Sequence, residues 1–132
     1  MKDRRPLAEQ WLSRAKGSLS RARQGRTTGD IFYEDLCFDC QQAGEKSLKA
    51  LMILHNIVPS PTHSLSVLIE TLETHRIAVP DMVKEAVPLS YYAVTTRYPG
   101  HYEPIDHREY KAALKNAEVV VAWVDEQLSR WD

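Results

Sequence analysis

Seven consecutive residues, Thr96–Tyr102, bring several chemically active side chains close together in the sequence. Arg97 has a planar guanidinium that suits phosphate, and the imidazole of His101 can donate a hydrogen bond or act as an acid or base. Tyr98 and Tyr102 could stack on a nucleobase. The structural alternative is an arginine that completes a helix C-terminus and tyrosines that pack a loop against the protein. The residue types alone leave both interpretations open.

A second polar group lies in Gln41–Leu51, which has the sequence QQAGEKSLKAL. Gln41, Glu45 and Lys49 are four residues apart and therefore share one face of a helix. Glu45 and Lys49 can form a helix-stabilising ion pair, so the pattern favours a solvent-exposed polar face. Lys46, in the neighbouring row, and Lys49 are also candidate supplementary cations for a ligand phosphate.

Gly44 lies in the middle of this helical pattern. A glycine inside a helix costs about 1 kcal/mol relative to alanine. Its presence predicts the close approach of another helix, either from this chain or from a second copy.

Cys37 and Cys40 form a C-x2-C motif, and they are the only two cysteines of the chain. A zinc site would need a second pair of ligands, which His55 and His63 could supply only if the fold brought them there. Both cysteines have helical spacing, and Cys40 falls on an apolar stripe, so we expect two small buried residues. We predict no metal site and no cofactor.

Several large classes of protein are excluded by what the sequence lacks. It has no glycine-rich phosphate loop, no G-x-S-x-G and no H-E-x-x-H motif. The longest apolar run, Val119–Val124, has six residues, whereas a membrane span needs roughly 20. The charged N-terminus is not followed by an apolar stretch of the kind a secretory signal requires. With only two cysteines, we expect a cytoplasmic protein without membrane association.

Apolar residues recur at spacings of three and four along the whole chain, and this period predicts helices. No alternating strand pattern occurs. The 132 residues fit a single domain over 1–132. We therefore predict an all-α, up-and-down antiparallel bundle of four long helices plus a short fifth helix. The expected long helices lie around 8–22, 32–58, 80–98 and 106–128, and the short one around 64–72.

Charge is unevenly distributed along the chain, although the net charge is only −1. The first 26 residues contain eight basic and two acidic residues, whereas the rest contain nine basic and sixteen acidic ones. We expect the basic first helix to pack beside acidic neighbours. The alternative is that it attracts an anionic partner.

Three motifs in order resemble the HEPN domain family, the small α-helical family named for nucleotide binding in higher eukaryotes and prokaryotes. Gln41–Leu51 is similar to the family's QQA-x-EK-x-LKAL segment. Thr62–Leu65, which reads T-H-S-L, is similar to the H-x-L start of the family's next helix. Thr96–Pro99, which reads T-R-Y-P, is similar to its R-Y-P turn. The resemblance extends from about Trp11 to Leu128.

The resemblance implies a helical bundle that is often a homodimer and is linked to nucleotides such as ATP or GTP, or to RNA. Stand-alone prokaryotic members are often encoded beside a minimal nucleotidyltransferase, as two-component or toxin–antitoxin pairs. One branch of the family cleaves RNA without metal through an R-x4-6-H motif. Arg97 and His101 have the spacing R-x3-H, and Pro99 and Gly100 interrupt the helix that would hold them on one face. This departure favours the binding branch.

Three hypotheses follow from the residues and the resemblance. The first is a non-catalytic module that binds a nucleotide, partners a minimal nucleotidyltransferase, or does both. Its candidate ligand-binding residues are Arg97, Tyr98, His101, Tyr102, Lys46 and Lys49. The second is a metal-independent ribonuclease toxin that uses Arg97 and His101. The third is a purely structural dimerisation partner.

Overall fold

The computed structural model describes residues 3–94, 99–100 and 102–131, and all regular structure within them is helical. The all-α class is thus confirmed. Among the described helices, none is long and apolar enough to cross a membrane. The elements in chain order are α1 (Arg5–Arg23), α2 (Tyr33–Leu54), α3 (Leu65–Thr74), α4 (Asp81–Lys84), the 3₁₀ helix η1 (Val87–Ala93) and α5 (His107–Ser129).

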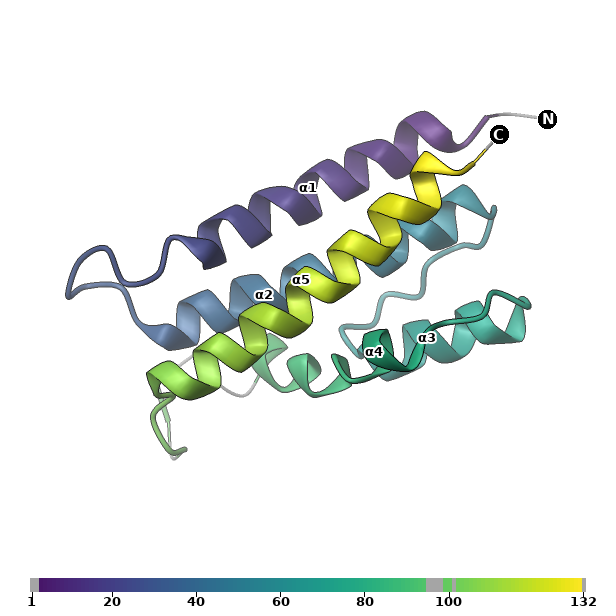
Figure 1. Ribbon diagram of the computed structural model, residues 1–132. Helices are drawn as coiled ribbons and strands as arrows, with labels where there is room; N and C mark the ends of the chain where they lie inside the picture. The colour runs from purple at the N-terminus through teal and green to yellow at the C-terminus, as the bar shows by residue number, and fades with distance from the viewer. Residues whose placement is uncertain (1–2, 95–98, 101, 132) are drawn as a thin grey trace.

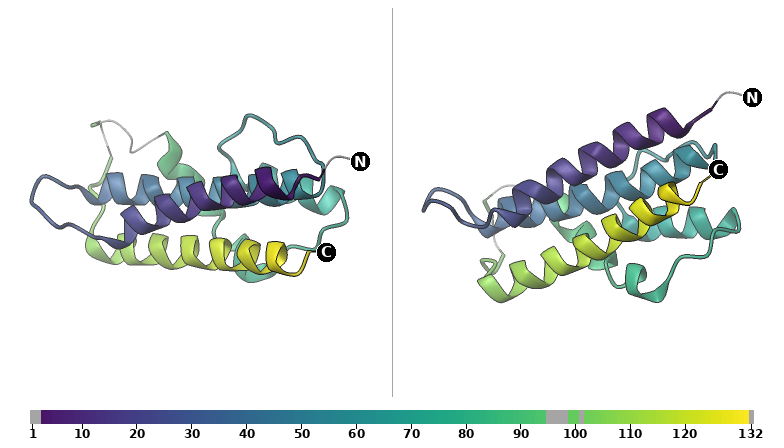
Figure 2. Two further views of the ribbon diagram at one scale, coloured as in Figure 1. Left: turned by 90° about the horizontal axis from the view of Figure 1, so that it is seen from above. Right: turned by 45° about the horizontal axis from the view of Figure 1, so that its top comes forward.

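The three long helices α1, α2 and α5 lie side by side (Figures 1 and 2). Helix α1 runs antiparallel to both of its neighbours, so α2 and α5 point in the same direction (Figure 1). Three ion pairs connect α1 to these neighbours, which confirms that the basic first helix packs beside acidic residues. They are Lys16–Asp125, Arg21–Asp39 and Arg23–Glu118.

The apolar stripe predicted for the first helix is buried throughout. No residue of the stripe is more than 5% exposed, and the two leucines are the only ones above zero. This face packs on α2 and α5, where burial of apolar area is the main favourable contribution to folding. The stripe consists of Ala8, Leu12, Ala15, Leu19 and Ala22.

The segment between α2 and α3 runs back along α2 before α3 begins. The side chain of Gln41, in the first half of α2, donates a hydrogen bond to the backbone carbonyl of His63 over 3.1 Å. Helix α3 therefore starts beside the middle of α2. Gly44 lies at this contact, since a Cβ built on it would come within 3.2 Å of a Leu65 methyl group. The close approach predicted from Gly44 is thus an internal one.

The prediction of a fourth long helix around 80–98 is wrong over the part of this range that the structure describes. A single turn, α4, is followed by the 3₁₀ helix η1. Pro88 lacks a backbone N–H, and its ring clashes with the carbonyl four residues earlier, so an α-helix cannot continue through it. The expected stripe of Val83, Val87, Tyr91, Val94 and Tyr98 fails accordingly. Tyr91 and Val94 are exposed, and Tyr98 lies outside the described residues.

The buried positions in this region instead recur every third residue. A 3₁₀ helix has three residues per turn, so a spacing of three keeps side chains on one face. This face joins the core formed by α2 and α5. Its residues are Val83, Ala86, Leu89 and Tyr92.

Candidate functional site

A buried carboxylate at the middle of α2 organises the polar residues of Gln41–Leu51. The two oxygens of Glu45 accept three hydrogen bonds, from Gln41 Nε2 at 2.9 Å, His63 Nδ1 at 2.8 Å and Lys49 Nζ at 3.0 Å. We call Gln41, Glu45, Lys49 and His63 the polar cluster. Three of its members come from successive turns of α2, and the fourth comes from the segment that runs back along the helix.

The prediction that Gln41, Glu45 and Lys49 form a solvent-exposed face of α2 is therefore wrong. Gln41 is fully buried, and Glu45 and Lys49 are only 6% and 7% exposed. The residues that lead into α3 cover them, and no periodicity within α2 could indicate that cover. Of the four, only His63 has a largely exposed side chain.

The surroundings of Glu45 keep its carboxyl group ionised. Burial alone would raise its pKa, but the hydrogen bonds from Gln41, His63 and Lys49, with the positive charge of Lys49, lower it on balance. The cation of Lys49 is thus used inside the protein. Lys46 donates to Ser18 Oγ over 3.3 Å and is half-buried between α1 and α2.

Cys37 and Cys40 are buried, free thiols on α2, as the sequence predicted. Burial raises the pKa of Cys37 to about 12 and raises that of Cys40 further. Both thiols are therefore protonated and unreactive near neutral pH. In the described part of the chain, no three His, Cys, Asp or Glu residues gather closely enough to hold a metal ion.

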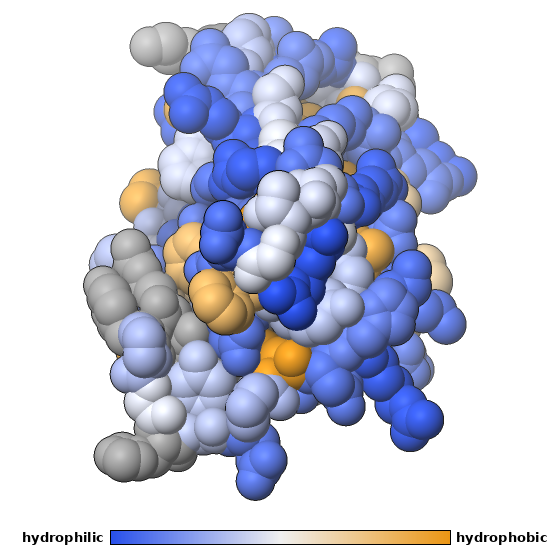
Figure 3. Space-filling model, turned by 90° about the vertical axis from the view of Figure 1, so that its left-hand side faces the viewer, coloured by the Kyte–Doolittle hydropathy of each residue, from blue (hydrophilic) through white to orange (hydrophobic). Residues whose placement is uncertain are grey.

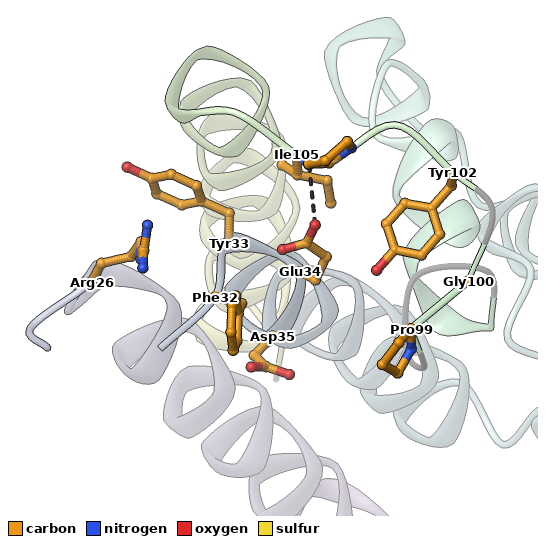
Figure 4. A pocket seen from close by; sticks show the side chains of 10 residues that line it. Arg26, Phe32, Tyr33, Glu34, Asp35, Pro99, Gly100, Tyr102 and Ile105 are labelled. Atoms are coloured by element: carbon orange, nitrogen blue, oxygen red, sulfur yellow. Dashed lines mark hydrogen bonds between the residues drawn. The ribbon is translucent and has the colours of Figure 1, made fainter. Parts of the chain in front are cut away.

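A cavity of about 500 Å³ opens at the end of the bundle where α1 leads into α2. It lies between this connection and the segment that precedes α5 (Figure 4). We call it the aromatic pocket, because Phe32, Tyr33 and Tyr102 all line it. On this face of the molecule, hydrophobic residues form small separate patches among hydrophilic ones (Figure 3). The remaining described lining residues are Arg26, Glu34, Asp35, Pro99, Gly100, Pro104 and Ile105.

Arg26 carries the only positive charge among the described residues that line the pocket. Its guanidinium carbon lies 5.5 Å from the ring centre of Tyr33 and 6.0 Å from that of Phe32, which are cation–π distances. The same group donates hydrogen bonds to the carbonyls of Ile31 and Gly29. Arg26 is therefore held in place at one end of the pocket (Figure 4).

Glu34 forms part of the opposite half of the pocket, facing Tyr102 (Figure 4). Its Oε2 accepts a hydrogen bond from the backbone N–H of Ile105 over 3.1 Å. This bond connects the start of α2 to the segment before α5. The pKa of the Tyr102 phenol is raised by desolvation and then by the negative charge of Glu34. Flat apolar rings, a cation and two carboxylates thus surround one cavity.

The predicted site residues do not all come together. Tyr102 lines the pocket, whereas Arg97, Tyr98 and His101 lie outside the described residues. Lys46 and Lys49 follow Glu34 on the same helix and lie about 18 and 22 Å further along it, at 1.5 Å per residue. They do not line the pocket.

Sequence reasoning missed the contribution of the connection between α1 and α2. Arg26, Phe32 and Glu34 line the pocket, but Phe32 and Glu34 were interpreted only as the start of the long helix around 32–58, and Arg26 only as part of the basic first 26 residues. Phe32 had been assigned to the apolar stripe of that helix, whereas it is the N-cap residue of α2 and is 58% exposed. Their closeness to Tyr102 depends on how the bundle folds, which the sequence pattern does not specify.

Comparison with known proteins agrees with this architecture. The family model for the HEPN domain matches residues 8–127. The chain belongs to the HEPN domain family. Comparison with curated proteins finds no match. The HEPN motifs at the middle of α2 and the start of α3 supply the polar cluster.

Two solved structures are similar to this HEPN chain over nearly its whole length. TT1696 from Thermus thermophilus is 32% identical, with a TM-score of 0.79, over 90% of this chain and 96% of that one. ST0689, described as an archaeal HEPN homologue, is 27% identical, with a TM-score of 0.71, over 97% of this chain and 99% of that one.

Proposed function

We propose that this HEPN protein is a non-catalytic module that binds a nucleotide in the aromatic pocket. The observation that carries the proposal is the pocket itself. Its volume of about 500 Å³ lies within the roughly 300–1,000 Å³ of small-molecule sites. The exposed ring of Phe32 offers a stacking surface to a base, and the half-buried ring of Tyr102 lines the same cavity. Arg26 at one end offers a positive charge to phosphate.

The R-Y-P segment supports the same placement by its position in the sequence. Pro99 and Gly100 line the pocket and directly follow Arg97 and Tyr98. In this proposal Arg97, Tyr98 and His101 are further candidate contacts to the ligand, as the match of Arg97 to the family motif implies. Lys46 and Lys49 have no part in it, because they lie several turns further along α2.

Calorimetric titration with ATP, GTP and their diphosphates tests the proposal directly. We expect saturable binding by the wild-type protein and a Kd raised at least about fivefold by Phe32→Ala, because stacking of a base on an aromatic ring is worth about 1–3 kcal/mol. Met82→Ala is the matched control, since Met82 is similarly exposed but does not line the pocket.

Two results would contradict the proposal. Absence of heat with every nucleotide at millimolar concentration would remove the ligand altogether. Binding that Phe32→Ala leaves unchanged would place the ligand outside the aromatic pocket. The melting temperature of each variant, measured without ligand, separates loss of contact from loss of fold.

We further propose that the protein acts with a minimal nucleotidyltransferase, with this chain as the binding member of the pair. The support for this partnership is family resemblance, and the experiment is a pull-down from the native host read by mass spectrometry. A nucleotidyltransferase recovered in near-equal amount is the expected result. Recovery of this chain alone would contradict the partnership. RNA cleavage without metal that is lost in Arg97→Ala would contradict the non-catalytic assignment.

A further inference from the structure

The polar groups of the aromatic pocket restrict which base it can hold, if the proposed nucleotide site is right. Glu34 and Asp35 line it with carboxylates, which accept hydrogen bonds and donate none when ionised. Arg26 already donates to two backbone carbonyls at the end of the pocket away from Tyr102. A base beside these carboxylates must therefore present donors to them.

Glu34 is the better placed of the two carboxylates. Its side chain is half-buried, and the Ile105 N–H fixes one oxygen at 3.1 Å. In this proposal the other oxygen accepts from the ligand. Asp35 is exposed, so water competes for any hydrogen bond that it makes. Figure 4 shows the Glu34 carboxylate between the sides of the pocket that carry Phe32 and Tyr102. A base stacked between these two sides of the pocket would bring its edge to Glu34.

Guanine is the common base whose edge matches a carboxylate. Its N1–H and its exocyclic N2 amino group are adjacent donors, and a carboxylate can accept from both. Adenine offers one amino group beside N1, an acceptor that would face a negatively charged oxygen. We propose that Glu34 recognises the Watson–Crick edge of guanine, so that the pocket binds guanine nucleotides in preference to adenine nucleotides.

The same carboxylates orient the rest of the ligand. Phosphate groups are repelled by Glu34 and Asp35 and attracted by Arg26, which lies at the other end of the pocket (Figure 4). The base therefore occupies the side with Glu34 and Tyr102, and the phosphates extend toward Arg26.

The test compares GDP, ADP and xanthosine diphosphate on the wild-type protein and on Glu34→Gln. Glutamine keeps an oxygen that can accept from the Ile105 N–H, and it replaces the other oxygen with a donor. We expect the wild type to prefer GDP over ADP at least tenfold, since hydrogen bonds to charged groups are strong. Glu34→Gln should abolish that preference and favour xanthosine diphosphate, which carries an oxygen in place of the guanine amino group.

Asp35→Asn is the matched control, because it removes the same charge from the neighbouring residue. It should keep the preference for GDP over ADP while strengthening the binding of both. Equal affinity of the wild type for GDP and ADP, or a preference for ADP, would overturn the inference and leave nucleotide binding intact. A preference for GDP that survives Glu34→Gln would overturn the role of Glu34. Failure to bind any of the three would overturn both the inference and the proposed function.

Discussion

At the residue scale, Glu45 shows how much a carboxylate inside a helical bundle depends on its partners. Taking two charges out of water costs several kcal/mol per ion, and their attraction offsets this only when further hydrogen bonds complete the site. Glu45 and Lys49 meet that condition, because Gln41 and His63 also donate to the same carboxylate. The polar cluster thus connects α2 to the start of α3 through hydrogen bonds.

Replacement of Glu45 by Gln should destabilise the protein strongly near neutral pH. The change leaves the buried ammonium of Lys49 without its counter-ion, and removal of one member of a buried pair costs roughly 3–5 kcal/mol. The folded-state pKa of Glu45 lies below its ordinary value of 4.5, so its contribution is present above about pH 4.5 and is lost as the pH falls. Urea unfolding at several pH values should therefore show the gap between wild type and E45Q narrowing in acid.

A double variant provides the control for this prediction. Lys49→Met in the E45Q background removes the unpaired cation and should recover part of the lost stability. A gap between wild type and E45Q that stays constant or widens in acid would contradict the role given to the carboxylate charge.

The candidate site was only partly predictable from single residues. The residue types in 96–102 left a binding segment and a structural one equally open, and Tyr102 does line the pocket. The pattern could not indicate that Glu34 and Phe32 lie on the facing wall, because no local rule relates residues so far apart in sequence. The polar row on α2 was misjudged for the same reason, since its cover comes from another part of the chain.

At the scale of elements, α2 and α3 end in the same way. Asn56 and Arg76, one residue beyond each C-cap, have φ values of 60° and 67°, in the left-handed region. The next residue then bonds back to the helix: Ile57 N–H to the carbonyl of Met52, and Ile77 N–H to that of Leu72. This arrangement satisfies carbonyls that would otherwise lack partners. Arginine is a poor residue for such a conformation.

Replacement of Arg76 by Gly should stabilise the protein by about 0.5–1 kcal/mol. Glycine adopts a positive φ without strain, although it loses more conformational entropy on folding. Asn56→Gly should gain less, because asparagine already tolerates this region. Thermal unfolding measures both changes. Arg76→Ala is the control, since it removes the guanidinium but keeps the strained Cβ, and a gain equal to that of glycine would contradict the explanation.

Helical periodicity predicted the elements well wherever the chain contains no proline. The stripes of the first and last helices correspond to α1 and α5, and that of the second to α2. It failed between 80 and 94, where a spacing of four was assumed across Pro88. The buried residues there recur every third position, so the sequence contained the 3₁₀ period, and the proline was the clue to it.

At the scale of the whole molecule, the uneven charge along the chain becomes an arrangement in space. Three cations of α1 pair with acids on α2 and α5, and the side chains are largely exposed apart from Asp39. Exposed ion pairs contribute about 0–1 kcal/mol each. The basic residues of α1 therefore connect this helix to α2 and α5 through ion pairs, and these pairs add little to the free energy of unfolding.

Salt should consequently have a small effect on unfolding. Raising sodium chloride from about 0.05 M to 0.5 M screens exposed pairs and should lower the free energy of unfolding by less than about 2 kcal/mol. Urea titrations at the two salt concentrations measure this difference. A loss larger than about 3 kcal/mol would contradict the conclusion that these ion pairs contribute little to the free energy of unfolding.

The start of α1 and the end of α5 lie side by side, and this has a practical consequence. The Arg5 guanidinium donates to the carbonyl of Trp131, so α1 starts beside the point where α5 ends, whereas the aromatic pocket lies at the far end of the same helices (Figure 1). A surface anchor, label or fused domain at either end therefore sits roughly a full helix length, about 28 Å, from the aromatic pocket. A short peptide linker could also close the chain into a ring, with new ends opened in an exposed turn and the pocket kept intact.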